Sequence, residues 1–168
     1  MPIAADVVLG ANVRICHPQL VNLYGCVIGE DVVIGPFVEV QARSRVGRRC
    51  KIGSHSFICS GVVFDEEVMI AHGVMFTNDI YPCHARPEIG PDAPSDWRLL
   101  TTRVGRGVVI GSNATIVAGV TIGAGVVIAA GVVVTCDVPA NATVLGGTPR
   151  VVSPLSPIAR TPVYEALP

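Results

Sequence analysis

Bulky apolar residues recur at every sixth position through two long stretches of the chain. The residue two places before each of them is small or β-branched, and both project from the same side of an extended backbone. An α-helix has 3.6 residues per turn and cannot hold a period of six on one face. The bulky positions are Ile28, Ile34, Val40, Val46, Ile52, Ile58, Phe64, Ile70 and Phe76, and then Val104, Ile110, Ile116, Ile122, Ile128 and Val134.

This period predicts a coil with three short, flat sides. Each side is a strand of about five residues followed by a corner, and successive coils pair as parallel strands about 4.8 Å apart. Glycine directly follows seven of the bulky residues, and we assign these glycines to corners where the backbone needs relaxed geometry. A weaker phase at Leu9, Ile15 and Val21 joins Ile28 after a one-residue insertion. The pattern predicts an all-β prism of about six coils, roughly 29 Å long.

The two strong phases are out of register with each other. The separation between Phe76 and Val104 is not a multiple of six. Residues from about 79 to 101 are therefore an excursion from the prism, and their prolines exclude regular structure there. A loop of this length inside a compact domain is usually functional. We divide the chain into a single β-helix domain at 1–150 and a proline-rich tail at 151–168.

Composition indicates which classes of partner and which cellular location to expect. The 29 valines and 14 isoleucines, beside 18 glycines, favour strands and turns over helices. A net charge of −1 with a single lysine argues against nucleic acid as a partner. The N-terminus has no basic, apolar leader and the longest apolar run is about half a membrane span, so we expect no membrane contact and a cytoplasmic location. Six cysteines without a Cys-x-x-Cys pair are expected to be free, buried thiols.

Two segments of the chain carry a resemblance to a known superfamily. One runs from Ile110-Gly111-Ser112 to Ile122-Gly123, and the other runs from Val133 to the Gly146–Arg150 turn. Together with the hexads over roughly 1–150, they resemble the hexapeptide-repeat acyltransferases, which fold as left-handed parallel β-helices. The resemblance implies a homotrimer with active sites between subunits, and acetyl-CoA as a co-substrate lying along the prism.

The segment His72–Asp79, which reads HGVMFTND, narrows the resemblance. It looks most like N-acetyltransferases that act on nucleotide-linked amino sugars in surface-polysaccharide biosynthesis. In those relatives an asparagine at the position of Asn78 lies at the reacting centre. The sugar O-acetyltransferases begin the corresponding loop with a His-Pro pair, and here that place reads Tyr81-Pro82. The resemblance therefore implies an amino-sugar substrate.

The acceptor site is expected around the edge of the prism that carries His55 and His72, with Asn78 six residues after His72 at the matching place on the next corner. His72 is the candidate base or proton relay because histidine titrates near neutrality, and Asn78 is the candidate for orienting the amine or the thioester. His55 precedes His72 by close to one coil, and Asp79 is expected to hold the loop or the substrate. The remaining candidates are Trp97 and Arg98 for the substrate, and Asn113, Gly119, Ala129, Ala130, Gly131, Thr135 and Arg150 for CoA.

Each of these positions also has an ordinary structural interpretation. Corner residues such as His55 and Asn113 cap turns through side-chain hydrogen bonds, small residues pack the repeat, and Trp97 packs the loop against the prism. Two other functions stay open: an O-acetyltransferase with a histidine base, and a non-catalytic scaffold. No metal site is expected, because the sequence has no His-x4-His pair and no third ligand at a sensible spacing from Cys83 and His84.

Overall fold

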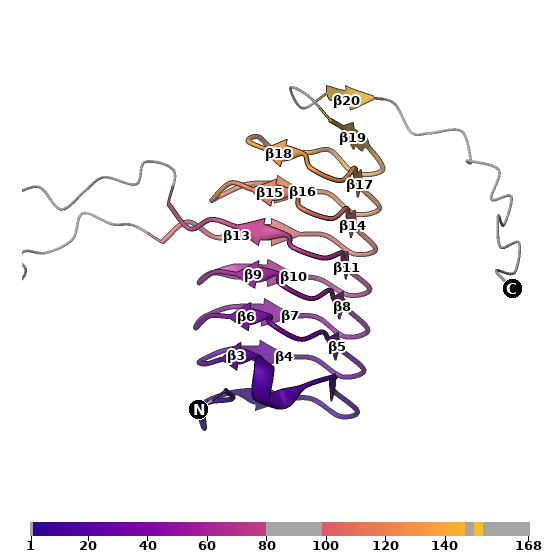
Figure 1. The fold of residues 1–168 in the computed structure, drawn as a ribbon. Coiled ribbons are helices and arrows are strands. Elements are labelled where there is room, and N and C mark those ends of the chain that lie inside the picture. Colours follow the sequence, from indigo (N-terminus) through magenta and orange to yellow (C-terminus); the bar gives the residue numbers. More distant parts are fainter. Residues whose placement is uncertain (1, 80–98, 147–149, 153–168) are drawn as a thin grey trace, which may run out of the picture.

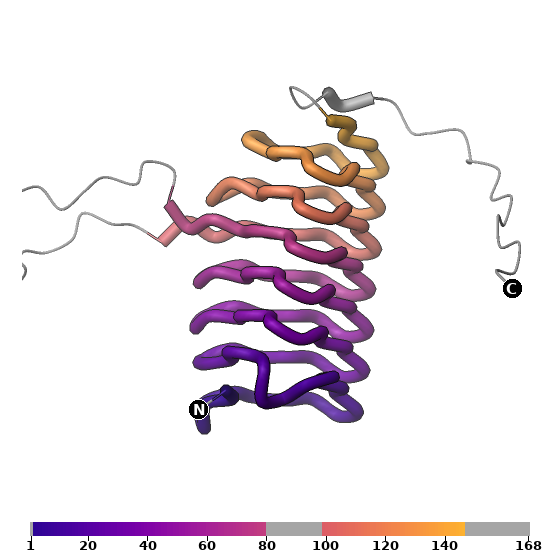
Figure 2. Tube along the Cα trace, viewed as in Figure 1, coloured from indigo at the N-terminus to yellow at the C-terminus, as the bar shows by residue number. Residues whose placement is uncertain are grey.

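The computed structural model describes residues 2–79 and 99–146, together with the backbone of residues 150–152. These residues form a parallel β-helix whose coils stack from the N-terminal to the C-terminal end (Figures 1 and 2). Three sheets form its three faces. Face 1 contains β1 (Val8–Leu9), β4 (Val27–Ile28), β7 (Arg45–Val46), β10 (Val62–Phe64), β13 (Thr102–Val104) and β16 (Thr121–Ile122).

Faces 2 and 3 complete each coil. Face 2 contains β2 (Arg14–Ile15), β5 (Val33–Ile34), β8 (Lys51–Ile52), β11 (Met69–Ile70), β14 (Val109–Ile110), β17 (Val127–Ile128), β19 (Thr143–Leu145) and β20 (Arg150–Val152). Face 3 contains β3 (Asn22–Leu23), β6 (Glu39–Val40), β9 (Phe57–Ile58), β12 (Met75–Phe76), β15 (Thr115–Ile116) and β18 (Val133–Val134). We name the edges by the faces that they join: corner 12, corner 23 and corner 31.

The predicted class and coil number are confirmed. Strands β1 to β18 make six complete coils, and β19 with the Ile122–Val138 bridge begins a seventh. The residues at the six-residue positions point inward and are almost fully buried, and the rings of Phe64 and Phe76 pack with centroids 5.3 Å apart. These side chains form one continuous apolar column between the three faces. Its burial stabilises the fold, as the core between two layers does in an ordinary domain.

The first coil departs from the predicted register. A short 3-10 helix, η1 (Pro18–Leu20), separates β2 from β3. As a result Leu23, and not Val21, takes the place of the bulky residue and pairs with Val40, while Val21 takes the buried place two residues before it. The pairing of Arg14 with Val33 spans one residue more than a regular coil, whereas that of Asn22 with Glu39 spans one fewer. Along the chain, the step from Arg14 to Asn22 is two residues longer than a regular side of six, and the step from Asn22 to Val27 is one residue shorter. Together they give the net one-residue shift seen in the sequence.

The seven glycines that follow bulky residues have a different cause from the predicted one. None of them has a positive φ. Instead, a Cβ at each would lie closer than 3.0 Å to backbone atoms of the next coil, so these sites need the missing side chain and not unusual backbone angles. They lie at the ends of faces 1 and 2, at Gly29, Gly35, Gly47, Gly53, Gly105, Gly111 and Gly123.

The excursion leaves and rejoins the prism at corner 31. Strand β12 ends at Phe76 and β13 begins at Thr102, which pairs with Val62 of the coil below. The backbone N–H of Ala118 donates to Thr77 Oγ1 (3.0 Å), and the Leu99 side chain lies over Gly61. Figure 1 shows the chain leaving the stack at the level of β13. The predicted excursion, from about 79 to 101, lies between these two strands, and most of its length lies outside the described residues.

Three of the five described cysteines match the prediction of free, buried thiols. Cys26, Cys50 and Cys59 are buried, and burial raises the pKa of Cys50 and of Cys59 to about 11. Such thiols stay protonated and unreactive at neutral pH. The prediction is wrong for Cys16 and Cys136, which are free but exposed. Cys83 lies outside the described residues.

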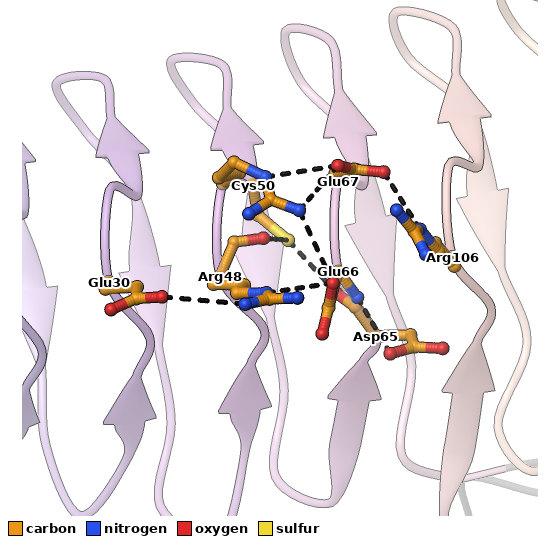
Figure 3. Close-up of polar contacts among 8 residues, drawn as sticks. Glu30, Arg48, Cys50, Asp65, Glu66, Glu67 and Arg106 are labelled. Carbon is orange, nitrogen blue, oxygen red and sulfur yellow. Dashed lines mark hydrogen bonds and ion pairs between the residues drawn. The ribbon is translucent and has the colours of Figure 1, made fainter.

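Corner 12 carries a ladder of ion pairs between successive coils (Figure 3). Arg48 lies 3.8 Å from Glu30 in the coil below and 2.9 Å from Glu66 in the coil above. Glu67 lies 2.6 Å from Arg49 and 2.9 Å from Arg106 on either side. These side chains are partly exposed, so the ion pairs contribute little to stability. Their main effect is to alternate positive and negative charges along this edge.

Glu67 makes the ladder sensitive to acid. Hydrogen bonds from Arg106 and Arg49 lower the pKa of Glu67 to about 2, from 4.5 for the free carboxyl group. The contacts therefore stabilise the fold above the unfolded-state pKa, and this contribution is lost as the pH falls toward 2. We expect the melting temperature of the wild type to fall more steeply than that of Glu67→Gln between about pH 5 and pH 2. High salt should shrink the difference because it screens exposed charges.

The matched control for this prediction is Glu30→Gln. Glu30 is an exposed carboxylate at the end of the same ladder, with its nearest arginine nitrogen at 3.8 Å. Its melting curve against pH should follow that of the wild type. Parallel curves for the wild type and Glu67→Gln would show that the Glu67 contacts do not contribute to stability.

Candidate active site

Corner 23 carries both predicted histidines, His55 and His72, on successive turns. The second residue of each turn has a positive φ, between 58° and 71°, and the occupants from coil to coil are Phe37, His55, Gly73, Asn113 and Gly131. His72 stands one position earlier in its turn, directly above Ser54. His55 and His72 are therefore near each other, as predicted, but they occupy different positions of successive turns.

The His72 ring is held by the turn of the coil below. Its Nδ1 lies 2.9 Å from Ser54 Oγ and accepts a hydrogen bond from the backbone N–H of Ser54 at 3.2 Å. The imidazole is exposed, so its other nitrogen, Nε2, is available to a bound molecule. Sequence reasoning missed Ser54. The signal that would have found it is its place one full coil before His72 in the sequence.

His55 makes a different contact. Its ring stacks on Phe37 of the coil below, with centroids 4.7 Å apart and an angle of 31° between the rings. Phe37 is 53% exposed, so the pair forms an apolar ledge on corner 23 two coils beneath the Asn113 turn. A tilted ring contact at this distance stabilises the pair.

Asn113 has a clear structural role. Its backbone N–H donates to the His72 carbonyl oxygen (2.9 Å), and its φ of 58° is one that asparagine tolerates. Its side-chain Oδ1 occupies the space above Gly73 that a Cβ would fill. These contacts support the interpretation of Asn113 as a turn residue beside His72. Its predicted role in CoA binding stays a prediction.

Asn78 lies on the next corner along the chain. It is half-buried at corner 31, two residues after β12, where the excursion begins. Asp79 follows it and is also half-buried. His72 and Asn78 are thus separated by one face of the prism, which is roughly 20 Å of fully extended chain. Within one copy of the chain, the structure does not bring the two predicted catalytic residues together.

The predicted CoA residues also divide between two corners. Ala130 and Gly131 form the exposed turn of corner 23 above Asn113, and Ala129 leads into it. Gly119 turns at corner 31 beside Leu100, and Thr135 is exposed where face 3 ends. The backbone of Arg150 pairs with Leu145 in the antiparallel strand β20. Trp97 and Arg98 lie outside the described residues.

Other kinds of site receive little support in the described part of the chain. Residues 2–79 and 99–146 contain no group of three or more metal-ligating side chains. In the same residues, no helix is long and apolar enough to cross a membrane. A shallow hollow lined by Asn12, Val13, Arg14 and Asp31 lies near corner 12 of the first coils, far along the prism from His72.

Part of the sequence matches a known family of repeat proteins. The family described as bacterial transferase hexapeptide (six repeats) matches residues 25–60 and 101–136, on either side of the excursion. The bifunctional protein GlmU of Koribacter versatilis is 30% identical over 112 residues, which cover 59% of this chain and 24% of that protein. The chain thus spans about a quarter of the length of this curated relative.

Solved structures share the fold across most of the chain. AntD, an N-acyltransferase from Bacillus cereus in complex with dTDP and coenzyme A, superposes with a TM-score of 0.69 at 19% identity, covering 88% of this chain and 83% of AntD. The acetyltransferase domain of PglB from Neisseria gonorrhoeae, in complex with acetyl coenzyme A, gives a TM-score of 0.62 at 21% identity, covering 88% of this chain and 58% of that chain.

The fold is thus a left-handed parallel β-helix built from six-residue repeats. Its turns and hexads are those of a repeat protein in which each coil contacts only its neighbours. The repeats on both sides of the excursion thus match those of the bacterial transferase hexapeptide family.

Proposed function

We propose that this protein is an acyl-CoA-dependent N-acetyltransferase whose acceptor is the amino group of a nucleotide-linked amino sugar. The observation that carries the proposal is the exposed His72, held by Ser54 on corner 23, one face away from Asn78 at the start of the excursion. Hexapeptide-repeat neighbours support it, because AntD was solved with dTDP and coenzyme A and PglB with acetyl coenzyme A.

The proposed reaction needs little from a protein base. The neutral amine attacks the thioester carbonyl carbon, forms the C–N bond and develops a negative charge on the carbonyl oxygen. When the C–S bond breaks, CoA leaves as a thiolate, and the proton lost by the nitrogen passes to it directly or through water. The products are the N-acetylated sugar and CoA. Positioning of the amine and a hydrogen bond to the developing oxyanion then lower the barrier.

The acceptor site is proposed to be shared between copies of the chain in a homotrimer. His72 and Asn78 stand on different corners of one copy, so a neighbouring copy must supply one of them to a common site. Large apolar side chains point outward on both faces that meet at corner 23, and a second copy would remove them from water. They are Phe37, Met75, Val109, Val127 and Val133, which are 40–53% exposed.

The test is direct transfer with a panel of acceptors. The purified protein, acetyl-CoA and nucleotide-linked 3- and 4-amino sugars should give a product heavier by one acetyl group in mass spectrometry. His72→Ala should give far less product. CoA at 100 times its dissociation constant should raise the free energy of unfolding by about 2.7 kcal/mol.

Other outcomes would point to the alternative functions. Acetylation of a hydroxyl-bearing sugar or of serine, with none of the amino sugars modified, would replace the proposal by an O-acetyltransferase. No product, together with no thermal shift on addition of CoA, would favour a non-catalytic scaffold.

A further inference from the structure

The contact between Ser54 and His72 determines which ring nitrogen carries the proton. A backbone N–H can only donate, and the Ser54 N–H points at His72 Nδ1 from 3.2 Å. Nδ1 must therefore present its lone pair. A neutral imidazole has one donor nitrogen and one acceptor nitrogen, so its proton is on Nε2. The Ser54 hydroxyl, 2.9 Å from Nδ1, adds a second contact on the same side of the ring.

The donor that fixes the ring is itself rigidly placed. The Ser54 carbonyl oxygen accepts the N–H of Gly73, and the His72 carbonyl oxygen accepts the N–H of Asn113, both at 2.9 Å. Each turn of corner 23 is thus bonded to the turn above it. Because the amide belongs to the backbone, its direction does not depend on a side-chain rotamer. The coil stacking itself holds Nδ1 as an acceptor.

We propose that Ser54 is a positioning residue that keeps His72 in the Nε2–H form, so that His72 donates a hydrogen bond to the thioester carbonyl oxygen and does not remove the proton of the amine. This inference rests on the proposed function. At Nε2 the neutral ring has a proton to offer and no lone pair to receive one. The amine proton goes to the leaving thiolate, as the reaction above requires, and His72 stabilises the charge on the oxygen.

The tautomer can be measured without any substrate. Long-range proton–nitrogen NMR correlations distinguish a pyrrole-type from a pyridine-type ring nitrogen, and His72→Gln identifies the His72 signals among the four histidines. In the neutral ring, Nε2 should be pyrrole-type and Nδ1 pyridine-type. Ser54→Ala keeps the backbone N–H and should keep the Nε2–H form. Ser54→Pro removes that N–H and should raise the Nδ1–H population. A predominant Nδ1–H form in the wild type would overturn the proposal.

Measurements of kcat for His72 variants then distinguish a hydrogen-bond donor from a general base. Glutamine retains an N–H donor but cannot act as a base near neutral pH, so His72→Gln should keep kcat within about tenfold of the wild type. His72→Ala, which has no donor, should lose about 100-fold. Equal losses in both variants, with the acid limb of the kcat–pH profile abolished, would identify a general base and overturn the proposal.

Two further variants complete the experiment. Ser54→Ala should lower kcat by about two- to tenfold with KM unchanged, the range expected for one hydrogen bond. His17→Gln is the matched control, because His17 is exposed on corner 23 of the first coil and should leave kcat unchanged. If no acceptor is acetylated while the Nε2–H form is observed, the proposed function fails and the Ser54–His72 pairing stands.

Discussion

Gly47→Ala is expected to destabilise the prism by about 3 kcal/mol, at the upper end of the usual cost of overpacking a well-packed site. The new Cβ would lie 2.5 Å from the carbonyl carbon of Asp65 and would collide with its oxygen. Neither side can yield easily, because the Gly47 N–H donates to Phe64 and the Asp65 N–H donates to Val104. Relief would require the two coils to separate and to weaken the hydrogen bonds between them.

Two other glycines provide matched controls in urea denaturation. A Cβ at Gly146 meets nothing within 4 Å, so Gly146→Ala should leave the unfolding midpoint unchanged. Gly107 is equally open but has a φ of +67°, so Gly107→Ala should cost only the backbone penalty of about 1 kcal/mol. A Gly47→Ala protein as stable as Gly146→Ala would contradict the steric explanation of the hexad glycines.

Asn78→Ala should lower kcat for amine acetylation by about 100- to 1,000-fold, the effect of removing a preorganised donor from a transition state. The thermal shift given by CoA should persist, because the substitution lies at the start of the excursion and leaves the upper coils intact. Circular dichroism should confirm an unchanged fold. An Asn78→Ala protein that acetylates the amine at the wild-type rate would remove Asn78 from the reaction.

Mixing two inactive variants tests whether the site is shared. In trimers reassembled from equal amounts of His72→Ala and Asn78→Ala chains, about a quarter of the interfaces combine an intact His72 with an intact Asn78. About a quarter of the wild-type activity should therefore return. If both residues served one site from a single copy, no activity would return.

The inward positions of the prism were predictable because one rule repeats. Every coil buries the residue at the sixth position, so neighbouring hexads define the phase even where a single hexad is irregular. The burial of Ile52 and of Ile116 was therefore predictable from the phase alone. The first coil was not predictable in detail. There η1 adds residues before Leu23 and the next corner removes some, so the sequence records only the net shift. The glycine rule was recognised, but its cause, backbone contact between coils, depends on the spacing of the coils.

The candidate site was predictable in position but not in contacts. The six-residue period places His72 and Asn78 on successive corners of one coil. It does not predict which side chains contact each other between coils, and for that reason Ser54 beneath His72 and Phe37 beneath His55 were missed. The excursion was recognised by its break in phase. Its inner residues, with Trp97 and Arg98, follow no repeat from which a position could be predicted.

The antiparallel strand β20 limits how the prism can grow. A stack of parallel coils presents, at its last coil, the same hydrogen-bonding groups that paired every coil before it, and such an open edge is a template for another chain. β20 pairs with β19 in the opposite direction, with Thr143 opposite Val152 and Leu145 opposite Arg150. The hydrogen-bond spacing of an antiparallel pair differs from that of a parallel pair. A coil from another molecule therefore does not find a matching edge on face 2, and end-to-end fibre formation is discouraged there.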